Sequence, residues 1–242
     1  MIVRPIAVLV GAAAMAVAHA SPDPQSTRTL VLGRSVDGRP IVAIEIGDRD
    51  SPRRALVVGC IHGNECAGVA VADRLIRMRV GDLDLWVVPN LNPDGFAAGT
   101  RGNADGVDLN RNFPWRWAPL EGGVDAGPRP LSEPESTLAF RLIERLRPSV
   151  SIWFHQHLDV VDRSGGLRSP VVAFAKAAHM RLRALVREPG SVTTWEGHCL
   201  LAASSFVVEL PAGSLSTNRA GLLAQATLAS ARLGLPGVAA RC

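Results

Sequence analysis

The sequence predicts an α/β protein, a three-layer α/β/α sandwich around a mixed, mostly parallel sheet. Apolar runs of strand length alternate with segments of helical periodicity along most of the chain, which is the pattern of a sheet covered by helices on both faces. Several of these runs end in polar side chains. In open α/β sheets that edge is where ligands bind.

The N-terminal segment has the order of a secretory signal. Arg4 precedes an almost unbroken apolar run from Ile6 to Ala18, and Ala18-His19-Ala20 then stands before Ser21-Pro22. We therefore expect residues 1–20 to be removed during export to a periplasm, a cell wall or the medium. The apolar run is shorter than the roughly 20 residues that span a bilayer, which argues against the alternative of a membrane anchor or a buried helix. No later stretch is long and apolar enough to span a membrane, so no stable membrane insertion is expected after removal. Residues 21–242 are expected to form one domain.

The first expected elements are a hairpin, a buried strand and a helix. Asp37-Gly38 is a turn signal between the β-rich runs Arg28–Gly33 and Arg39–Ile46. The continuous apolar run Ala55–Ile61 is typical of a strand covered on both faces. Apolar residues then recur with helical spacing over Gly68–Met78.

A long irregular stretch interrupts this alternation after the next strand, Leu83–Val88. From 90 to 130 the periodicity disappears, and Asn, Gly, Pro, Asp and Trp dominate. Such a stretch inside a compact domain is usually functional, or else its elements are misassigned. Regular structure resumes at Ser132, where Ser132-Glu133-Pro134-Glu135 has the spacing of a capping box. The remaining expected elements are a strand at Val150–Phe154, a helix at Ala173–Arg187, a strand at Ser205–Leu210 and a closing helix at Leu215–Leu233.

Composition argues against nucleic acid as a partner. The net charge of +4 is modest and almost entirely arginine, because Lys176 is the only lysine. The sequence has no basic cluster with interleaved aromatic residues, which nucleic-acid binding would favour. An anionic polymer such as a cell wall remains compatible with the charge.

The four cysteines leave their pairing open. In an exported protein they are permitted to form disulfides, but four cysteines allow three connectivities. None forms a CxxC pair, so zinc ligation by cysteine is not expected, and a free buried thiol is an alternative for Cys60. The four are Cys60, Cys66, Cys199 and Cys242.

The strongest chemical signal is a candidate metal site. His62-Gly63-Asn64-Glu65 follows the third expected strand, and a histidine and a glutamate at this spacing can turn one ligand atom each toward a metal ion at about 2 Å. His155 follows the apolar strand Val150–Phe154 and supplies a third ligand. Two histidines and a glutamate with an open fourth position form the hydrolytic type of zinc site.

A zinc site of this type needs a base, and Glu209 is the candidate. It stands at the end of the otherwise apolar strand Ser205–Leu210, where burying a carboxylate is costly unless it has a use. Its expected role is to take a proton from the attacking water and pass it to the leaving amine.

The irregular stretch adds groups that recognise a substrate. Arg111, flanked by Asn110 and Asn112, offers a planar fork for a substrate carboxylate. Arg101 supplies a second cation for the developing oxyanion.

Taken together, these motifs resemble the zinc carboxypeptidases. The matching segments occur in that family's order and are His62-Gly63-Asn64-Glu65, Asn92-Pro93-Asp94-Gly95, Val107-Asp108-Leu109-Asn110-Arg111-Asn112-Phe113, His155 and Val208-Glu209-Leu210. The resemblance implies one zinc ion per chain. It also implies a role for each candidate: His62, Glu65 and His155 as ligands, Glu209 as general base, Asn110 and Arg111 as binders of the terminal carboxylate, and Arg101 as the arginine that polarises the carbonyl.

Within that family the chain is similar to the murein tripeptide amidase branch, which implies cleavage of the γ-D-glutamyl–diaminopimelate bond of cell-wall peptides. The similarity rests on the short length, Gly99-Thr100-Arg101, Trp153-Phe154-His155-Gln156 and Pro189-Gly190-Ser191 followed by Trp195. His157 stands where that branch is expected to have proline, and its role stays open between a group behind the ligands and an alternative ligand. The chain has no tyrosine, so the substrate-capping tyrosine of the digestive enzymes is absent.

Three other functions remain open at this point. One is a metallocarboxypeptidase that acts on ordinary peptide C-termini, and another is an N-acyl amino acid deacylase. The third is a non-catalytic module that binds the cell wall. The sequence does not indicate an oligomeric state.

Overall fold

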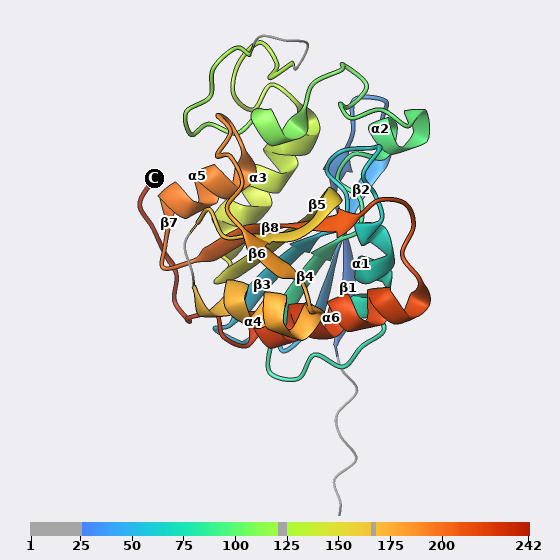
Figure 1. Cartoon of the computed structure of the whole chain (residues 1–242). Helices are drawn as coiled ribbons and strands as arrows, with labels where there is room; N and C mark the ends of the chain where they lie inside the picture. The colour runs from blue at the N-terminus through green and yellow to red at the C-terminus, as the bar shows by residue number, and fades with distance from the viewer. Residues whose placement is uncertain (1–25, 121–124, 166–167) are drawn as a thin grey trace, which may run out of the picture.

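Figure 1 shows a computed structural model, which describes residues 26–120, 125–165 and 168–242. The expected secretory signal lies outside the described residues. The strands are β1 Thr27–Arg34, β2 Pro40–Gly47, β3 Arg54–Val58, β4 Asp84–Val88, β5 Val150–Asp162, β6 Arg181–Arg183, β7 Leu200–Leu201, β8 Ser204–Pro211 and β9 Ala239–Ala240. The helices are α1 Gly68–Ile76, α2 Pro93–Ala98, the short 3-10 helix η1 Leu109–Arg111, α3 Pro134–Leu146, α4 Ser169–Ala178, α5 Val192–Cys199 and α6 Thr217–Ala231.

The main sheet is mixed, as the sequence predicts. Its strand order is β1-β2-β4-β3-β5-β6, and β8 pairs with β5. Pairing is antiparallel between β1 and β2 and between β2 and β4. It is parallel between β3 and β4, between β3 and β5, between β5 and β6, and between β8 and the first part of β5. The hairpin expected at Asp37-Gly38 is present, and Gly38 takes the left-handed conformation, with φ of 79°, that its turn requires.

Two apolar cores flank this sheet and make the three layers. Alternate residues of a strand point to opposite faces, so the inner strands β2, β3, β4, β5 and β8 contribute to both cores. On one face α1, α4 and α6 cover the sheet, and on the other face α3 and α5 do so (Figure 1). The first core includes Leu75, Ile152, Phe154, Phe174, Val208 and Leu223, and the second includes Leu56, Leu142, Ile143, Trp153, Trp195 and Val207.

The pairing between β5 and β8 explains how the chain forms its cavity. Along Val150 to His157, the residue numbers of the partners on β8 increase, and His155 lies opposite Glu209. After Leu158 the residue numbers of the partners decrease, with Val160 opposite Glu209 and Val161 opposite Val208. The chain therefore reverses direction, and β8 has residues of β5 on both sides. The expected strand Val150–Phe154 is only the first part of β5.

One expected helix is wrong. The segment Ala173–Arg187 was expected to be one helix, but α4 ends at Ala178, and His179 follows it in the left-handed conformation. Arg181–Arg183 then forms β6 beside the returning part of β5. The alanine, leucine and arginine residues of this segment suit a helix by propensity, and sheet pairing overrides that preference.

The expected capping box is also wrong in detail. Helix α3 begins at Pro134, and its N-cap is Glu133, which makes no side-chain capping hydrogen bond. Ser132 Oγ donates to Glu133 Oε1 at 2.6 Å, and Asn103 Nδ2 donates to Glu133 Oε2 at 2.7 Å. The Glu133 carboxylate is thus held by the irregular stretch, which fixes where the helix begins.

The cysteines form two disulfides, Cys60–Cys66 and Cys199–Cys242. The alternative of a free thiol at Cys60 is therefore wrong. The first bridge spans the turn that carries His62 and Glu65. Among the described residues, no helix has the length and apolar character that crossing a bilayer would require.

Asp84, the first residue of β4, is a buried carboxylate with few interactions that stabilise its charge. It accepts a hydrogen bond from Trp86 Nε1 at 2.8 Å, and Arg54 Nε lies 3.4 Å from its other oxygen. Burial, together with the nearby charge of Glu45, raises the pKa of Asp84 to about 6. The folded protein therefore holds a proton that the unfolded chain has already released between about pH 4 and pH 6.

We predict that Asp84→Asn removes a pH dependence of folding. In the wild type the free energy of unfolding should fall as pH rises from about 4 to about 6, because the ionised carboxylate is disfavoured in the folded state. At pH 7 the variant should be more stable by about 1 to 3 kcal/mol. Urea unfolding at pH 4.5 and 7 measures this. The control is Asp82→Asn, an exposed partner of Arg53, and equal profiles for wild type and Asp84→Asn would contradict the prediction.

Candidate active site

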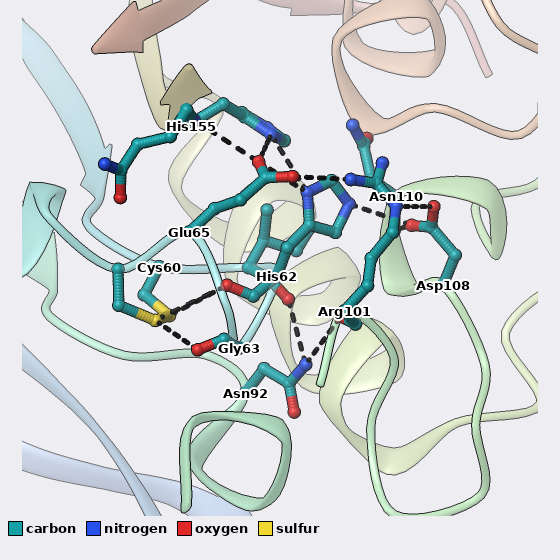
Figure 2. Close-up of polar contacts among 12 residues, drawn as sticks. Cys60, His62, Gly63, Glu65, Asn92, Arg101, Asp108, Asn110 and His155 are labelled. Atoms are coloured by element: carbon teal, nitrogen blue, oxygen red, sulfur yellow. Dashed lines mark hydrogen bonds and ion pairs between the residues drawn. A yellow bond between two sulfur atoms is a disulfide. The ribbon is translucent and has the colours of Figure 1, made fainter. Parts of the chain in front are cut away.

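Three possible ligand atoms, from two distant segments of the chain, converge at the carboxyl end of the central strands. His62 Nδ1 lies 3.1 Å from Glu65 Oε2 and 3.1 Å from His155 Nδ1, and His155 Nδ1 lies 3.3 Å from Glu65 Oε2. Figure 2 shows the three side chains pointing toward one another. The structure thus brings together the three residues that the sequence proposes as metal ligands.

The spacing of these atoms fits a single zinc ion. Ligand atoms about 2.0 to 2.2 Å from one tetrahedral zinc ion lie roughly 3.3 to 3.5 Å from one another. Two imidazole nitrogens and a carboxylate oxygen are also the donor types that zinc prefers. We therefore propose that His62, Glu65 and His155 hold the metal.

The turn that carries His62 and Glu65 is held against the irregular stretch by tight packing. A Cβ atom at Gly63 would lie 1.9 Å from the carbonyl carbon of Gly95 in α2, so only glycine fits there. Asn92 caps α2 by accepting from Gly95 N at 2.9 Å. Its amide nitrogen donates to the carbonyl oxygens of Ile61 and Gly102, each at 3.1 Å. Asn92 therefore ties the metal turn to the segment that carries Arg101.

Asp108 orients the first histidine from behind. Its Oδ1 lies 2.9 Å from His62 Nε2, the ring nitrogen that faces away from the cluster. A carboxylate on this nitrogen fixes the tautomer in which the other nitrogen is free to bind a metal. Asp108 also accepts from the backbone N–H of Asn110 at 2.9 Å, so the same carboxylate positions η1.

Arg101 links the two carboxylates of the site. Its Nη1 donates to Glu65 Oε1 at 2.6 Å, and its Nε donates to Asp108 Oδ2 at 2.9 Å (Figure 2). The side chain remains 40% exposed. Two of the five guanidinium N–H donors are used in these bonds, which leaves others for a ligand in the cavity.

The charges shift the pKa values of the cluster in different directions. Burial lowers the pKa of His155 to about 4. Burial also acts to lower the pKa of His62, but the hydrogen bonds to Asp108 and Glu65 outweigh it and raise that pKa. His155 is therefore neutral at pH 7, which is the form that binds a metal ion.

Glu209 lines the same cavity with one carboxylate oxygen free of partners. Among the described residues, buried side-chain atoms without a hydrogen bond are Glu209 Oε2 and His155 Nε2. Burial raises the pKa of Glu209, and the charge of Glu65 raises it further. A buried polar atom without a hydrogen-bond partner is costly. We therefore expect Glu209 Oε2 to form a hydrogen bond with water or with substrate.

Arg111 is fixed at the wall of the cavity by the loop before α5. A Cβ atom at Gly190 would lie 2.1 Å from the carbonyl oxygen of Arg111, and Gly190 has a φ of 67°. Arg111 Nη1 donates to the carbonyl oxygen of Asn110 at 2.9 Å, and its Nη2 lies 4.0 Å from Glu188 Oε2. The side chain is 13% exposed, so a nearly buried guanidinium faces the cavity with one weak ion pair.

A cavity of about 150 Å³ joins the candidate residues. Every residue that the sequence proposes for the site lies on its wall: His62, Glu65, Arg101, Asn110, Arg111, His155 and Glu209. The side chain of Asn110 is fixed at the cavity wall, because its Oδ1 accepts a hydrogen bond from Val192 N at 3.0 Å.

Two outcomes concern residues whose roles the sequence left open or did not assign. His157 is exposed and does not belong to the cluster that could hold a metal. Asp108 and Asn92 hold the site together, yet sequence reasoning gave neither of them a role. Both lie inside the motifs of the irregular stretch, and that location was the only signal.

Comparison with known proteins gives a family match. The family model described as zinc carboxypeptidase matches residues 13–162. Murein peptide amidase A of Escherichia coli (strain K12) is 33% identical over 145 residues, which are 54% of this chain and 60% of that protein. Carboxypeptidase SOL1 of Arabidopsis thaliana is 32% identical over 146 residues, 53% of this chain and 29% of that protein. The chain thus spans 60% or less of the length of these relatives.

Solved structures agree with this match. A murein-tripeptide amidase from Escherichia coli O157 superposes with a TM-score of 0.68 at 27% identity, over 82% of this chain and 91% of that chain. A carboxypeptidase A from Helicoverpa armigera gives a TM-score of 0.69 at 19% identity, over 86% of this chain and 67% of that chain. The second likeness shows the fold alone.

We predict that Asp108→Asn weakens zinc binding about 10- to 100-fold, because the charge behind His62 is lost. Competition with a chelator of known affinity measures this. The control is Asp105→Asn, an exposed residue of the same loop, which should leave the affinity unchanged. Equal zinc affinity for Asp108→Asn and wild type would show that Asp108 does not support the metal site.

Proposed function

The chain belongs to the zinc carboxypeptidase family, and on this premise we propose that it is a zinc-dependent hydrolase that cleaves an amide bond next to a free carboxylate. The observation that carries the proposal is the unpaired Glu209 Oε2 in the same cavity as the three converging ligand atoms. A candidate base, a candidate metal site and two arginines around one cavity can together support hydrolysis of an amide bond next to a carboxylate.

Each group has a separate task in the proposed reaction. A bound zinc ion would polarise the scissile carbonyl and acidify the attacking water. Glu209 Oε2 takes a proton from that water and gives it to the leaving nitrogen, and the raised pKa of Glu209 favours this donation. Arg101 donates to the carbonyl oxygen as negative charge develops on it.

Arg111 and Asn110 hold the free carboxylate of the substrate. The Arg111 guanidinium is nearly buried and has only the distant Glu188 as an ionic partner, at 4.0 Å. A carboxylate in a fork arrangement would replace that weak contact by two charged hydrogen bonds. Binding at this point would place the adjacent amide near the candidate metal site.

We propose the γ-D-glutamyl–diaminopimelate bond of murein peptides as the target. The support is the similarity to proteins named murein peptide amidase A and to the solved murein-tripeptide amidase. Export by the expected signal would bring the enzyme to this substrate. The absence of tyrosine from the chain fits a site that differs from that of the digestive carboxypeptidases.

We predict that Glu209→Gln lowers kcat by at least about 100-fold, because the amide cannot accept the proton of the attacking water. Zinc content should stay at one ion per chain, since Glu209 is not among the proposed ligands. Rate assays and metal analysis of the same preparation measure both. Glu144→Gln on α3, outside the cavity, is the matched control. Retained activity in Glu209→Gln would remove Glu209 from the mechanism.

A substrate panel tests the proposed reaction. We expect L-Ala-γ-D-Glu-meso-diaminopimelate to be hydrolysed faster than N-blocked peptides with ordinary C-terminal residues and faster than N-acyl amino acids. A chelator should abolish the activity, and amidation of the carboxylate nearest the scissile bond should reduce it, because Arg111 loses its partner. Faster cleavage of ordinary peptides would favour a metallocarboxypeptidase, and faster cleavage of acyl amino acids a deacylase. Stoichiometric zinc with no hydrolysis would favour a wall-binding module.

A further inference from the structure

The cavity extends beyond the candidate metal site to a charged end that the reaction itself does not use. There its wall is made by Asp162, Ser164, Arg187 and Thr193. A neighbouring cavity of about 140 Å³ shares Asp162, Arg187 and Thr193 with it. An aspartate and an arginine therefore stand where the two cavities meet.

Asp162 reaches this place because β5 reverses around β8. Val160 pairs with Glu209 and Val161 with Val208, so the chain returns along the strand that carries the base. Val161 packs in the core beneath α1, α4 and α6, and alternation turns the next side chain, Asp162, to the opposite face. That face carries Glu209 and Val207, which line the cavity.

The Asp162 carboxylate is buried without a cation. It is 6% exposed, and its oxygens accept from Ser164 N at 2.8 Å, Ser164 Oγ at 2.5 Å and Leu185 N at 3.0 Å. All three donors are neutral, and in the described part of the chain Asp162 has no ion pair. A buried negative charge is stabilised by a positive one, so this carboxylate suits an ammonium group of a ligand.

Arg187 offers the complementary charge. Its side chain is exposed, it lines both cavities, and the described residues provide it with no carboxylate partner. The nearby Glu188 carboxylate lies 4.0 Å from Arg111 instead. A guanidinium without a carboxylate partner can bind the planar carboxylate of a ligand through two parallel hydrogen bonds.

We propose that Asp162 and Arg187 determine specificity by binding the ammonium and the carboxylate at the far end of the substrate's side chain. This inference rests on the proposed function, because diaminopimelate carries both groups there. Arg111 and Arg187 would each bind one of the two free carboxylates of that residue, and Asp162 would bind its single free ammonium. Lysine, which has the ammonium alone, would satisfy Asp162 and leave Arg187 unpaired.

Arg187→Gln tests the assignment with a pair of substrates. L-Ala-γ-D-Glu-X is used with X either meso-diaminopimelate or L-lysine. The variant should lose about 10- to 100-fold in kcat/KM on the diaminopimelate peptide, the effect expected of a charged hydrogen-bond pair, and less than about 3-fold on the lysine peptide. Arg183→Gln on β6, an arginine outside both cavities, is the matched control and should change neither value.

Asp162→Asn tests the second half of the pair. It should lower kcat/KM on both peptides relative to a peptide with X as L-alanine, because both lose an ammonium partner. Thermal unfolding shows whether the variant is folded. If it is not, Ser164→Ala, which frees one oxygen of Asp162 from its hydroxyl partner, should leave the preference for charged over neutral X intact or increased. A preference lost in Ser164→Ala, or unchanged in folded Asp162→Asn, would overturn the role of Asp162.

A binding measurement separates this inference from the proposed function. Calorimetry with free meso-diaminopimelate and free L-lysine should give tighter binding of diaminopimelate to the wild type, and Arg187→Gln should abolish the difference. If the wild type shows this preference but hydrolyses none of the peptides, the proposed function is wrong and the specificity pair stands. If the wild type hydrolyses the diaminopimelate peptide but Arg187→Gln keeps the same substrate ratio, the specificity pair is wrong and the proposed function stands.

Discussion

His62 Nδ1, His155 Nδ1 and Glu65 Oε2 lie within 3.3 Å of one another, and the contacts around them hold these three atoms in place. Acceptor atoms at this distance repel unless a proton or a cation lies between them. The fold supplies the restraint from outside the cluster. Adjacent parallel strands β3 and β5 bring the two histidine segments together, and Asp108 and Arg101 fix His62 and Glu65 from behind.

The reversal of β5 around β8 gives one short region of sheet two chemical tasks. Before the reversal β5 delivers His155 to the cluster, and after it the same strand delivers Asp162 to the far end of the cavity. Glu209 on β8 lies between the two parts. The proposed base is held in the middle of a sheet and is restrained on both sides by backbone hydrogen bonds, and rigid elements position reacting groups better than loops do. The reversal also sets the spacing between the candidate metal site and the charged end of the cavity.

What the sequence could predict depended on how local each signal was. The proposed metal ligands follow apolar strands, so strand ends in parallel neighbours predicted their meeting, and the sheet confirms it. The roles of Asp108 and Asn92 depend on contacts among irregular segments, which no periodicity encodes. The helix expected over Ala173–Arg187 was wrong because pairing with the returning part of β5 is a long-range contact. The same hidden reversal is why Asp162 and Arg187 had no signal in the sequence.

Several carboxylates surround the cavity, and their mutual repulsion lowers the stability of the fold. Other contacts nearby offset this loss. Glu65, Asp162 and Glu209 place three carboxylates on the cavity wall, with Asp108 behind His62, and Glu209 Oε2 has no partner among the described residues. Active sites commonly trade stability for such arrangements. The Cys60–Cys66 disulfide limits the freedom of the metal turn in the unfolded chain. A cation that binds only the folded cluster would add to the stability of the fold, so metal binding would be coupled to folding through the same three atoms.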